Sequence, residues 1–405
     1  MKDKFDREHI RQHNRMLILS RIRRSGTTTR TDIGDMTGLS PATVTTITAE
    51  LMASGLLKEE PDRISVCTKG RPRLTLSLMK DAAFVVCGAI TFNQLNLYLC
   101  GFDGSVYDQR QVQFNSFKTT SADLTPILLD QLRDLLQANH VDRSRLGEIN
   151  ISIQGVIGEK EGAVLWSPAL ADGHFKLAPV IEEAFGVPCR LANDTNMITE
   201  ALHWVDPARY NGTFAVILLH QGVGMGLFID NELYSGQTGT AAEFGHSIHI
   251  PEGDRCRCGK RGCLEAYLGD YAILREASGA GGTAEEEEFY GQSNAFNRLI
   301  EKAMAGDGPA RAAFEKAGKA LGIGIGRVIS LFDPGRIVLT GPTMRAYPLM
   351  ETSLREGFSE TMASNLDTLL ELEVLHWSPD LIRQGMIAQS LARVDETLSF
   401  NVKQL

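Results

Sequence analysis

Hydrophobic residues recur at helical spacing over the first fifty residues, and this pattern predicts three short helices. The first covers residues 9–25, and the second is a short segment that Gly38 interrupts. The third begins with Ser40 and Pro41, a capping serine before a proline that fits the first helical turn, and extends to about residue 53. The residues expected on the inner faces are Ile18, Leu19, Ile22, Ile33, Met36, Val44, Ile47 and Leu51.

A short helix, a glycine-containing turn and a third helix that starts with small polar residues form a helix-turn-helix layout. Small side chains at the start of the third helix can approach phosphates and base edges of DNA. A hairpin wing is expected next, and arginines in its rigid tip, KGRPR at 69–73, can enter a minor groove. Winged helices that bind proteins are the alternative. The predicted DNA contacts are Ser40, Ala42, Thr43, Thr45, Thr46, Lys69, Arg71 and Arg73.

The distribution of charge favours DNA as the partner of this N-terminal segment. The chain carries a net charge of −9, from 41 Lys and Arg against 50 Asp and Glu. Residues 1–80 hold 15 of the basic and 9 of the acidic residues, a net of +6, so the remainder holds 26 against 41, a net of −15. A basic segment joined to an acidic body indicates that only the segment meets a polyanion.

Beyond residue 80, apolar runs bounded by turn residues predict an α/β body. Strands are expected over 84–90 and 95–102 before a turn at 103–104, and a similar order returns at 214–219 and 226–230. This repetition indicates an internally duplicated fold of two lobes with a cleft between them. The other expected elements are helices over 121–139, 179–185, 193–204, 294–330 and 385–394, strands over 149–153, 188–191 and 336–340, glycine-containing turns at 154–158 and 222–226, and a solvated segment at 278–292.

One histidine and three cysteines form an H-x9-C-x-C-x4-C array in the second half of the chain. Three thiols and one imidazole suit a closed, tetrahedral structural zinc site, whereas buried or idle thiols are the alternative. Glu243 and Glu265 flank the array, and a loop fixed by metal would hold both carboxylates as acceptors for a polyhydroxylated ligand. Solvated surface acids are the alternative there. The predicted ligands of one zinc ion per chain are His246, Cys256, Cys258 and Cys263.

Composition indicates a soluble cytoplasmic protein that does not insert into a membrane. The chain is 43% hydrophobic and 22% charged, and its longest apolar run, 214–219, falls far short of the ~18–20 residues of a membrane span. The first ten residues are charged and lack the apolar region of a signal peptide. An odd number of cysteines with three clustered suggests a reducing compartment. The other four, Cys67, Cys87, Cys100 and Cys189, are predicted to be small core residues.

Taken together, these motifs resemble the ROK family of repressors, open reading frames and kinases. The family's GH followed by C-x-C-G-x2-G-C-L-E appears here as Gly245-His246 and then 256–265, CRCGKRGCLE. The segment 39–45, LSPATVT, resembles the helix-turn-helix of the repressor branch, which includes the N-acetylglucosamine-operon and xylose-operon repressors and a glucose-responsive relative. The resemblance spans the whole chain. It implies an α/β fold in which an N-terminal winged helix-turn-helix precedes a duplicated, two-lobe actin/hexokinase-like (ribonuclease H-like) body.

The resemblance also implies a sugar site and a lost catalytic activity. The D-x-G-G-T phosphate loop of the kinases is replaced here by GAITFNQ at 88–94, and a kinase threonine appears as Val223. No enzymatic activity is therefore expected, although Asp194 occupies the position of the kinase general base. Gln154 and the segment Pro168-Ala169-Leu170 also depart from the kinase pattern, so the inducer need not be glucose. The sugar-binding residues implied are Asn193, Asp194, Glu243, His246 and Glu265.

The sequence therefore predicts a transcriptional repressor of carbohydrate-utilisation genes, with a sugar or sugar phosphate in the interlobe cleft changing its affinity for operator DNA. The expected domains are 1–80, the DNA-binding head; 81–198 with 380–405, the first lobe; and 199–379, the second lobe with the zinc site and oligomerisation helices. A homodimer, or a tetramer of two dimers, is expected. The alternatives are a sugar kinase fused to a DNA-binding domain and a repressor released by a protein partner.

Overall fold

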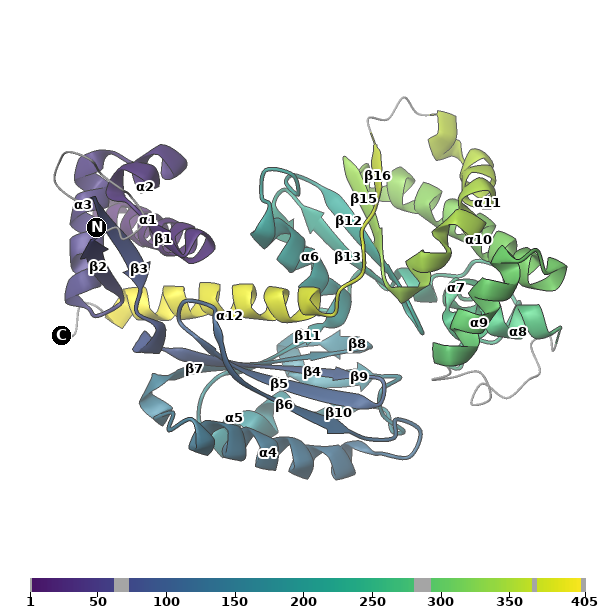
Figure 1. The fold of residues 1–405 in the computed structure, drawn as a ribbon, viewed down its shortest axis with the longest axis horizontal. Coiled ribbons are helices and arrows are strands. Elements are labelled where there is room, and N and C mark those ends of the chain that lie inside the picture. Colours follow the sequence, from purple (N-terminus) through teal and green to yellow (C-terminus); the bar gives the residue numbers. More distant parts are fainter. Residues whose placement is uncertain (1, 62–72, 280–292, 366–369, 402–405) are drawn as a thin grey trace.

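The computed structural model describes residues 2–61, 73–279, 293–365 and 370–401. The N-terminal head contains three helices and a small sheet in the strand order β1-β3-β2 (Figure 1). The predicted winged helix-turn-helix is thus confirmed, with a first helix that begins earlier than residue 9. The tip of the wing lies outside the described residues. The bounds are α1 Lys2–Ser25, β1 Thr27–Thr28, α2 Arg30–Thr37, α3 Pro41–Ala53, β2 Leu57–Pro61 and β3 Leu74–Leu78.

Local capping explains why α3 starts where it does. Ser40 is the N-cap, and its hydroxyl accepts a hydrogen bond from the Thr43 N–H at 3.2 Å, while Pro41 occupies the first turn. Gly38 ends α2 in the left-handed conformation, with φ of 70°. The predicted inner face is confirmed except at Met36, whose side chain is 42% exposed because the body does not cover that end of α2.

Two five-stranded sheets with matching topology form the body. The first has the order β11-β7-β4-β5-β6 and the second β14-β13-β12-β15-β16, and in each a hairpin is followed by parallel strands. This confirms the duplicated fold. The strands of the first sheet are β4 Phe84–Thr91, β5 Gln94–Gly101, β6 Val106–Gln113, β7 Leu146–Ile153 and β11 Cys189–Asn193; those of the second are β12 Phe214–Leu219, β13 Val223–Ile229, β14 Glu232–Leu233, β15 Arg336–Thr340 and β16 Glu371–Val374.

Helices cover both faces of each sheet, as buried runs of strand residues require. Helices α4 and α5 pack on one face of the first sheet, and α10 shares a core with one face of the second. Helices α6 and α12 contribute to a core that includes residues of both sheets and of the head (Figure 1). The helices of the body are α4 Ser121–Ala138, α5 Ala178–Phe185, α6 Asp194–Val205, α7 Glu265–Leu268, α8 Asp270–Ser278, α9 Ser293–Met304, α10 Gly308–Phe332, α11 Tyr347–Ser359 and α12 Asp380–Asn401.

Two predicted turns are in fact strands. Residues 156–158 form β8 in a three-stranded sheet, the third sheet of the body. The turn predicted at 154–158 therefore comprises only residues 154 and 155. Most of the glycine-rich segment 222–226 lies in β13, which pairs with β12. Gly224 and Gly226 face α6 so closely that a Cβ on either would overlap Thr195 or Thr199. The strands of the third sheet are β8 Val156–Gly158, β9 Ala163–Trp166 and β10 Phe175–Lys176; short 3-10 helices occur at Lys80–Ala82, Arg143–Arg145, Glu159–Glu161, Phe244–His246, Pro342–Ala346 and Met362–Asn365.

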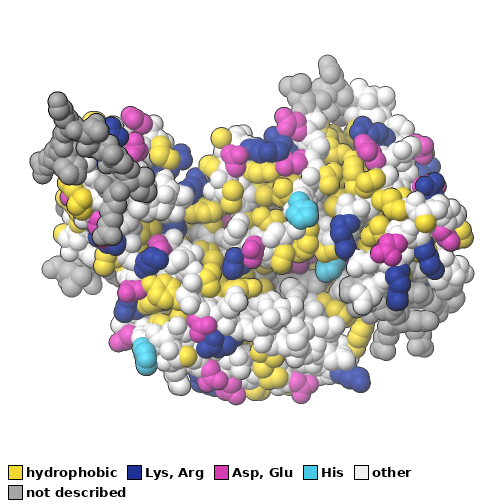
Figure 2. Space-filling view, in the orientation of Figure 1, with side chains coloured by type: hydrophobic (Ala, Val, Ile, Leu, Met, Phe, Trp, Pro, Cys, Tyr) yellow, Lys and Arg dark blue, Asp and Glu magenta, His cyan; other side chains and the backbone are white. Residues whose placement is uncertain are grey.

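Some of the remaining sequence predictions concern described residues, and others concern residues outside them. The predicted core cysteines Cys87, Cys100 and Cys189 are buried, whereas Cys67 lies outside the described residues. Most of the predicted solvated segment, residues 280–292, lies outside them as well. Within the described part of the chain, no helix combines the length and apolar character needed to cross a membrane. Acidic and basic side chains of the body are interspersed on the face shown in Figure 2.

Candidate functional site

The structure brings the four predicted metal ligands together. One ligand atom from each of His246, Cys256, Cys258 and Cys263 lies within 4.8 Å of the others. The Cys258 and Cys263 sulfurs are 3.7 Å apart, and the Cys256 sulfur is 3.7 Å from the His246 Nδ1. A tetrahedron with Zn–S distances of ~2.3 Å has sulfur–sulfur edges of about 3.8 Å, so the cluster fits a four-coordinate zinc ion.

The loop that carries the cysteines is folded by its own backbone. Cys256 N–H donates to the Lys260 carbonyl at 2.8 Å, and the left-handed Gly259, with φ of 84°, makes the tight turn between them. Cys256 and Cys263 are buried, and burial raises the pKa of Cys263 to about 11 and that of Cys256 further. Buried thiols with such pKa values hold their protons unless a cation replaces them. The donor set therefore suits a metal ion rather than free thiolates.

A pocket in the cleft joins all five predicted sugar-binding residues. Glu265 is buried, with its Oε2 accepting the Val223 N–H at 3.1 Å, and Asp194 is buried, with its Oδ1 accepting the Thr195 N–H at 2.8 Å. Asn193 caps α6 through its Oδ1 and donates from Nδ2 to the Gly155 carbonyl at 2.7 Å. The alternative of solvated acids is thus wrong for Glu265. The predicted residues among those that line the pocket are Asn193, Asp194, Glu243, His246 and Glu265.

Two carboxylates of the pocket have raised pKa values. Burial raises the pKa of Glu243 to about 7, and the neighbouring Glu265 and Asp194 carboxylates raise it as well. Burial raises the pKa of Asp194 to about 6, opposed by its hydrogen bonds from Thr195. Burial makes ionisation of these carboxylates unfavourable. They therefore favour a ligand with several hydroxyl groups, since each hydroxyl that donates a hydrogen bond stabilises an ionised carboxylate.

His246 belongs to both the pocket and the metal cluster. Its Nδ1 faces the Cys256 sulfur, so Nε2 is the nitrogen left to carry the proton when Nδ1 binds a metal ion. The Trp166 ring meets the imidazole edge-on at 5.3 Å between centroids and also lines the pocket. Sequence reasoning missed Trp166, because nothing in the local pattern of β9 distinguishes a pocket tryptophan from a core one.

The start of α3 presents small side chains to solvent. Ala42, Thr45 and Thr46 are exposed. The hydroxyls of Thr45 and Thr46 donate to carbonyls one turn back, at 2.8 and 2.9 Å, so these side chains offer methyl groups and acceptor lone pairs to a partner. The hydroxyls of Ser40 and Thr43 are 2.9 Å apart, and Ser40 is committed to capping. Of the predicted wing contacts, Arg73 is exposed, whereas Lys69 and Arg71 lie outside the described residues.

Three arginines of the head are paired with acids of the head. Glu50 on α3 pairs with Arg11 and with Arg15 of α1, and Glu59 on β2 pairs with Arg30. These pairs join the elements of the head and leave the exposed face of α3 uncharged. The net positive charge of residues 1–80 is therefore not concentrated on the helix predicted to read DNA.

Comparison with known proteins now identifies the family. The ROK family pattern matches residues 90–379, and a pattern described as winged helix-turn-helix DNA-binding matches residues 11–58. The chain belongs to the ROK family.

Several known proteins match most or nearly all of the chain. The xylose repressor of Bacillus subtilis (strain 168) is 25% identical, covering 91% of this chain and 92% of that protein. The DNA-binding transcriptional dual regulator NagC of Escherichia coli (strain K12) is 24% identical, covering 88% of each. The crystal structure of a ROK family transcriptional regulator, a homolog of the E. coli MLC protein, superposes with a TM-score of 0.76 at 25% identity, covering 98% of this chain and 100% of that one.

A ROK kinase shares the fold of about three quarters of the chain. A ROK family glucokinase from Streptomyces griseus, solved in complex with glucose and AMPPNP, superposes with a TM-score of 0.58 at 22% identity. It covers 77% of this chain and 99% of its own.

The ROK body is joined to the head by a buried ion pair. The Arg23 guanidinium on α1 donates to both Asp395 carboxylate oxygens on α12, at 2.8 and 2.9 Å, and from Nε to the Phe102 carbonyl at 3.0 Å. The Arg23 and Asp395 side chains are each only 3% exposed. Next to Arg23, the Arg24 guanidinium lies 4.4 Å from the centroid of the Trp204 ring, in the last turn of α6. Helix α6 therefore begins at the pocket and ends against the head.

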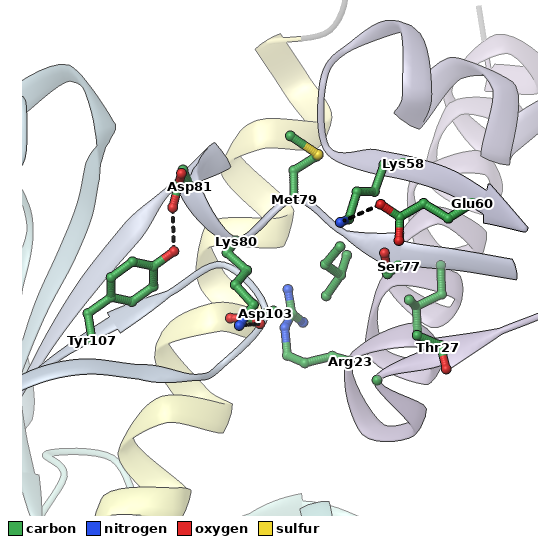
Figure 3. Close-up of a pocket in the computed structure, with 13 residues that line it drawn as sticks. Arg23, Thr27, Lys58, Glu60, Ser77, Met79, Lys80, Asp81, Asp103 and Tyr107 are labelled. Carbon is green, nitrogen blue, oxygen red and sulfur yellow. Dashed lines mark hydrogen bonds and ion pairs between the residues drawn. The ribbon is translucent and has the colours of Figure 1, made fainter. Parts of the chain in front are cut away.

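A crevice of about 740 Å³ lies beside this ion pair, between the head and the first sheet (Figure 3). Its charged side chains are matched: Lys58 pairs with Glu60 at 2.9 Å, Lys80 lies 3.7 Å from Asp103, and Asp81 accepts a hydrogen bond from Tyr107. Because these charged side chains interact with one another, the crevice does not indicate a charged ligand.

Proposed function

We propose that this chain is a transcriptional repressor whose affinity for operator DNA changes when a sugar binds between its lobes. The observation that carries the proposal is the path of α6, which starts at the pocket with Asp194 and ends with Trp204 against Arg24 of the head. The domains proposed to act together are the head, 1–80, the first lobe, 81–198 with 380–405, and the second lobe, 199–379.

The pocket requires movement to accept a sugar. The cavity that its residues enclose measures about 40 Å³, far below the ~300 Å³ at the lower end of ordinary ligand pockets. A sugar ring therefore has to displace a wall of the pocket, and the walls belong to both lobes and to the start of α6. A ligand that favours one arrangement over another shifts the protein towards it, and this linkage is how we propose that the signal reaches DNA.

The kinase alternative is disfavoured by the hairpin between β4 and β5. At its tip, Asn93 has a φ of 63°, and its N–H donates to the Ser116 hydroxyl at 2.8 Å. Nucleotide phosphates need backbone N–H groups or cations directed at them, and this N–H is already engaged. ATP-dependent sugar phosphorylation that is detected in a coupled assay and requires Asp194 would favour the kinase over the repressor.

The remaining parts of the proposal follow from the site. One structural zinc ion per chain would be held by His246, Cys256, Cys258 and Cys263. We further propose a cytoplasmic homodimer, or a tetramer of two dimers, so that two heads contact two operator half-sites. Release from DNA by a protein partner remains the alternative to a sugar, and operator binding measured across a panel of saccharides separates the two.

The first prediction concerns pH. Sugar hydroxyls that donate to Asp194 and Glu243 require ionised carboxylates, so we expect sugar affinity to fall as pH drops through about 7 and then about 6. Titration calorimetry between pH 5 and 8 measures this. Because the folded pKa of Glu243 is raised from its ordinary value of 4.5 to about 7, the native state loses stability as pH rises between these two values, and the loss is complete above about pH 7. Glu243→Gln should therefore unfold at a higher temperature than the parent at pH 8 but lose this advantage at pH 5, and an equal difference at both would contradict the assignment.

A second prediction tests the exposed start of α3. Ala42→Glu places an acid in the first turn, where it suits the helix dipole, so thermal stability should be unchanged or slightly raised. The same charge facing DNA phosphates should weaken operator binding by about a hundredfold or more. The neutral, size-matched Ala42→Gln is the control and should lose much less. Equal operator affinity of Ala42→Glu and the parent would remove this face from the interface.

A third prediction tests the ion pair between head and body. Asp395→Asn leaves Arg23 buried without its counter-charge, and breaking such a pair typically costs ~3–5 kcal/mol. We expect limited proteolysis to release the head faster and the effect of sugar on operator affinity to shrink. The conservative control is Asp130→Asn, which removes a partner from an exposed pair on α4 and should change neither property. An unchanged sugar response in Asp395→Asn would show that the signal takes another route.

A further inference from the structure

A second pocket adjoins the proposed sugar site on the far side of Asp194. Its cavity of about 340 Å³ falls within the range of small-molecule sites. Gln154, Asp194 and Leu218 line both pockets, so a ligand that extends from the first past Asp194 enters the second. Five separate segments form its walls: the β4–β5 hairpin, the turn after β7, the start of α6, the turn after β12, and the connection from β16 into the first turn of α12.

The chemistry of this pocket is that of aromatic faces and amides. Phe92, Tyr98 and Trp377 line it and are each partly exposed. The negative face of an aromatic ring suits the C–H face of a sugar ring. Gln94 and Asn96 lie side by side in β5, with the Gln94 Nε2 donating to the Asn96 Oδ1 at 2.9 Å. Side-chain amides offer donors and acceptors together, as sugar hydroxyls do.

The same pocket is poorly suited to a phosphate group. Its one lining arginine, Arg383, is shared between the Asp380 carboxylate at 3.1 Å and the Tyr98 ring, whose centroid lies 5.3 Å away. Burial lowers the pKa of His220 to about 4, so this imidazole is neutral. The Asp194 carboxylate on the shared wall would repel an anion. A sugar phosphate would thus meet one partly neutralised cation and one acid.

We infer that the second pocket receives a second sugar ring, so that the effector is a disaccharide or longer saccharide whose linkage passes Asp194. This inference rests on the proposed function and narrows its ligand class. One ring would occupy the pocket of Asn193, Glu243 and Glu265, and the next would pack against Trp377 and bond to Gln94 and Asn96. In this chain, aromatic and amide side chains thereby take the place of a nucleotide-binding surface.

The test is a binding series on the full-length protein. Isothermal titration calorimetry would compare cellobiose, maltose, lactose, sucrose and N,N′-diacetylchitobiose with their monosaccharides and the corresponding 6-phosphates. We expect one disaccharide to bind at least about tenfold more tightly than either of its component sugars. Trp377→Ala should remove about tenfold or more of that disaccharide's affinity while leaving monosaccharide affinity and sugar-free operator affinity unchanged.

Variants at Gln94 and Asn96 test the second pocket without changing a residue of the core. Because Trp377 also packs against the core, Gln94→Ala and Asn96→Ala provide a second test, and each should weaken the disaccharide selectively. Equal affinity for a disaccharide and its monosaccharide, unchanged by these variants, would overturn the inference of a second sugar ring but not the proposed function. Tightest binding by a 6-phosphate that Arg383→Gln abolishes would also overturn it, in favour of a phosphate subsite. Operator binding indifferent to every saccharide would instead contradict the proposed function.

Discussion

Cys258→Ser is expected to reduce bound zinc from about one ion per chain to nearly none and to loosen the loop between Glu243 and Glu265. The Cys258 and Cys263 sulfurs lie 3.7 Å apart, at the separation that tetrahedral zinc requires, and serine cannot replace a thiolate ligand. Structural zinc contributes folding free energy directly, so the loss should reach about 4 kcal/mol. Elemental analysis and thermal unfolding measure the two effects.

The same substitution should also weaken sugar binding, because both flanking carboxylates belong to the pocket. Cys189→Ala is the matched control, since Cys189 is a buried cysteine outside the cluster and should retain the metal. Chelation of the parent should reproduce the behaviour of Cys258→Ser. A Cys258→Ser protein that keeps one zinc ion and an unchanged sugar affinity would contradict the proposed metal centre.

Asp194→Asn is expected to give a protein that binds operator DNA normally but no longer responds at sugar concentrations that release the parent. Asp194 is buried at the start of α6 and lines both pockets, so its carboxylate meets the ligand wherever the ligand extends. A hydrogen bond to a charged group contributes ~1.5–3 kcal/mol, so sugar affinity should fall by about ten- to a hundredfold. The amide retains an oxygen for the Thr195 N–H, so folding should be largely unaffected.

Asp206→Asn, immediately after the other end of α6, is the control for this experiment. Asp206 is exposed and accepts the Arg209 N–H at 3.1 Å, so neutralising it changes charge near the same helix without touching either pocket. It should keep a normal sugar response. If Asp194→Asn lost operator binding in the absence of sugar, its carboxylate would have a structural role in the head–body arrangement instead.

Local sequence signals predicted the head well. Ser40 and Pro41 located the start of α3, and the spacing of Val44, Ile47 and Leu51 located its buried face, because capping and periodicity act within a few residues. The cysteine spacing likewise located a cluster that could hold a metal ion, since one short loop carries three of its four members. Met36 was assigned to the core wrongly, because burial at the end of α2 depends on what packs over it.

Tertiary packing decided the features that local patterns misjudged. Gly224 and Gly226 suggested a turn, but both lie in β13, where their absent side chains allow α6 to approach the strand. The carboxylates of Glu243 and Glu265 could be surface acids or pocket acids until the lobes were placed. The second pocket could not be predicted, because its walls come from segments as distant as Phe92 and Trp377.

Fluorescence anisotropy of the full-length protein on its own upstream DNA, titrated with sugars, disaccharides and sugar phosphates, tests the central claim most directly. The account predicts specific, salt-dependent binding that one saccharide weakens by a factor of about ten or more, and that Asp194→Asn renders insensitive to that saccharide. Tight specific binding that no member of the panel changes would contradict a sugar-coupled repressor and favour control by a protein partner.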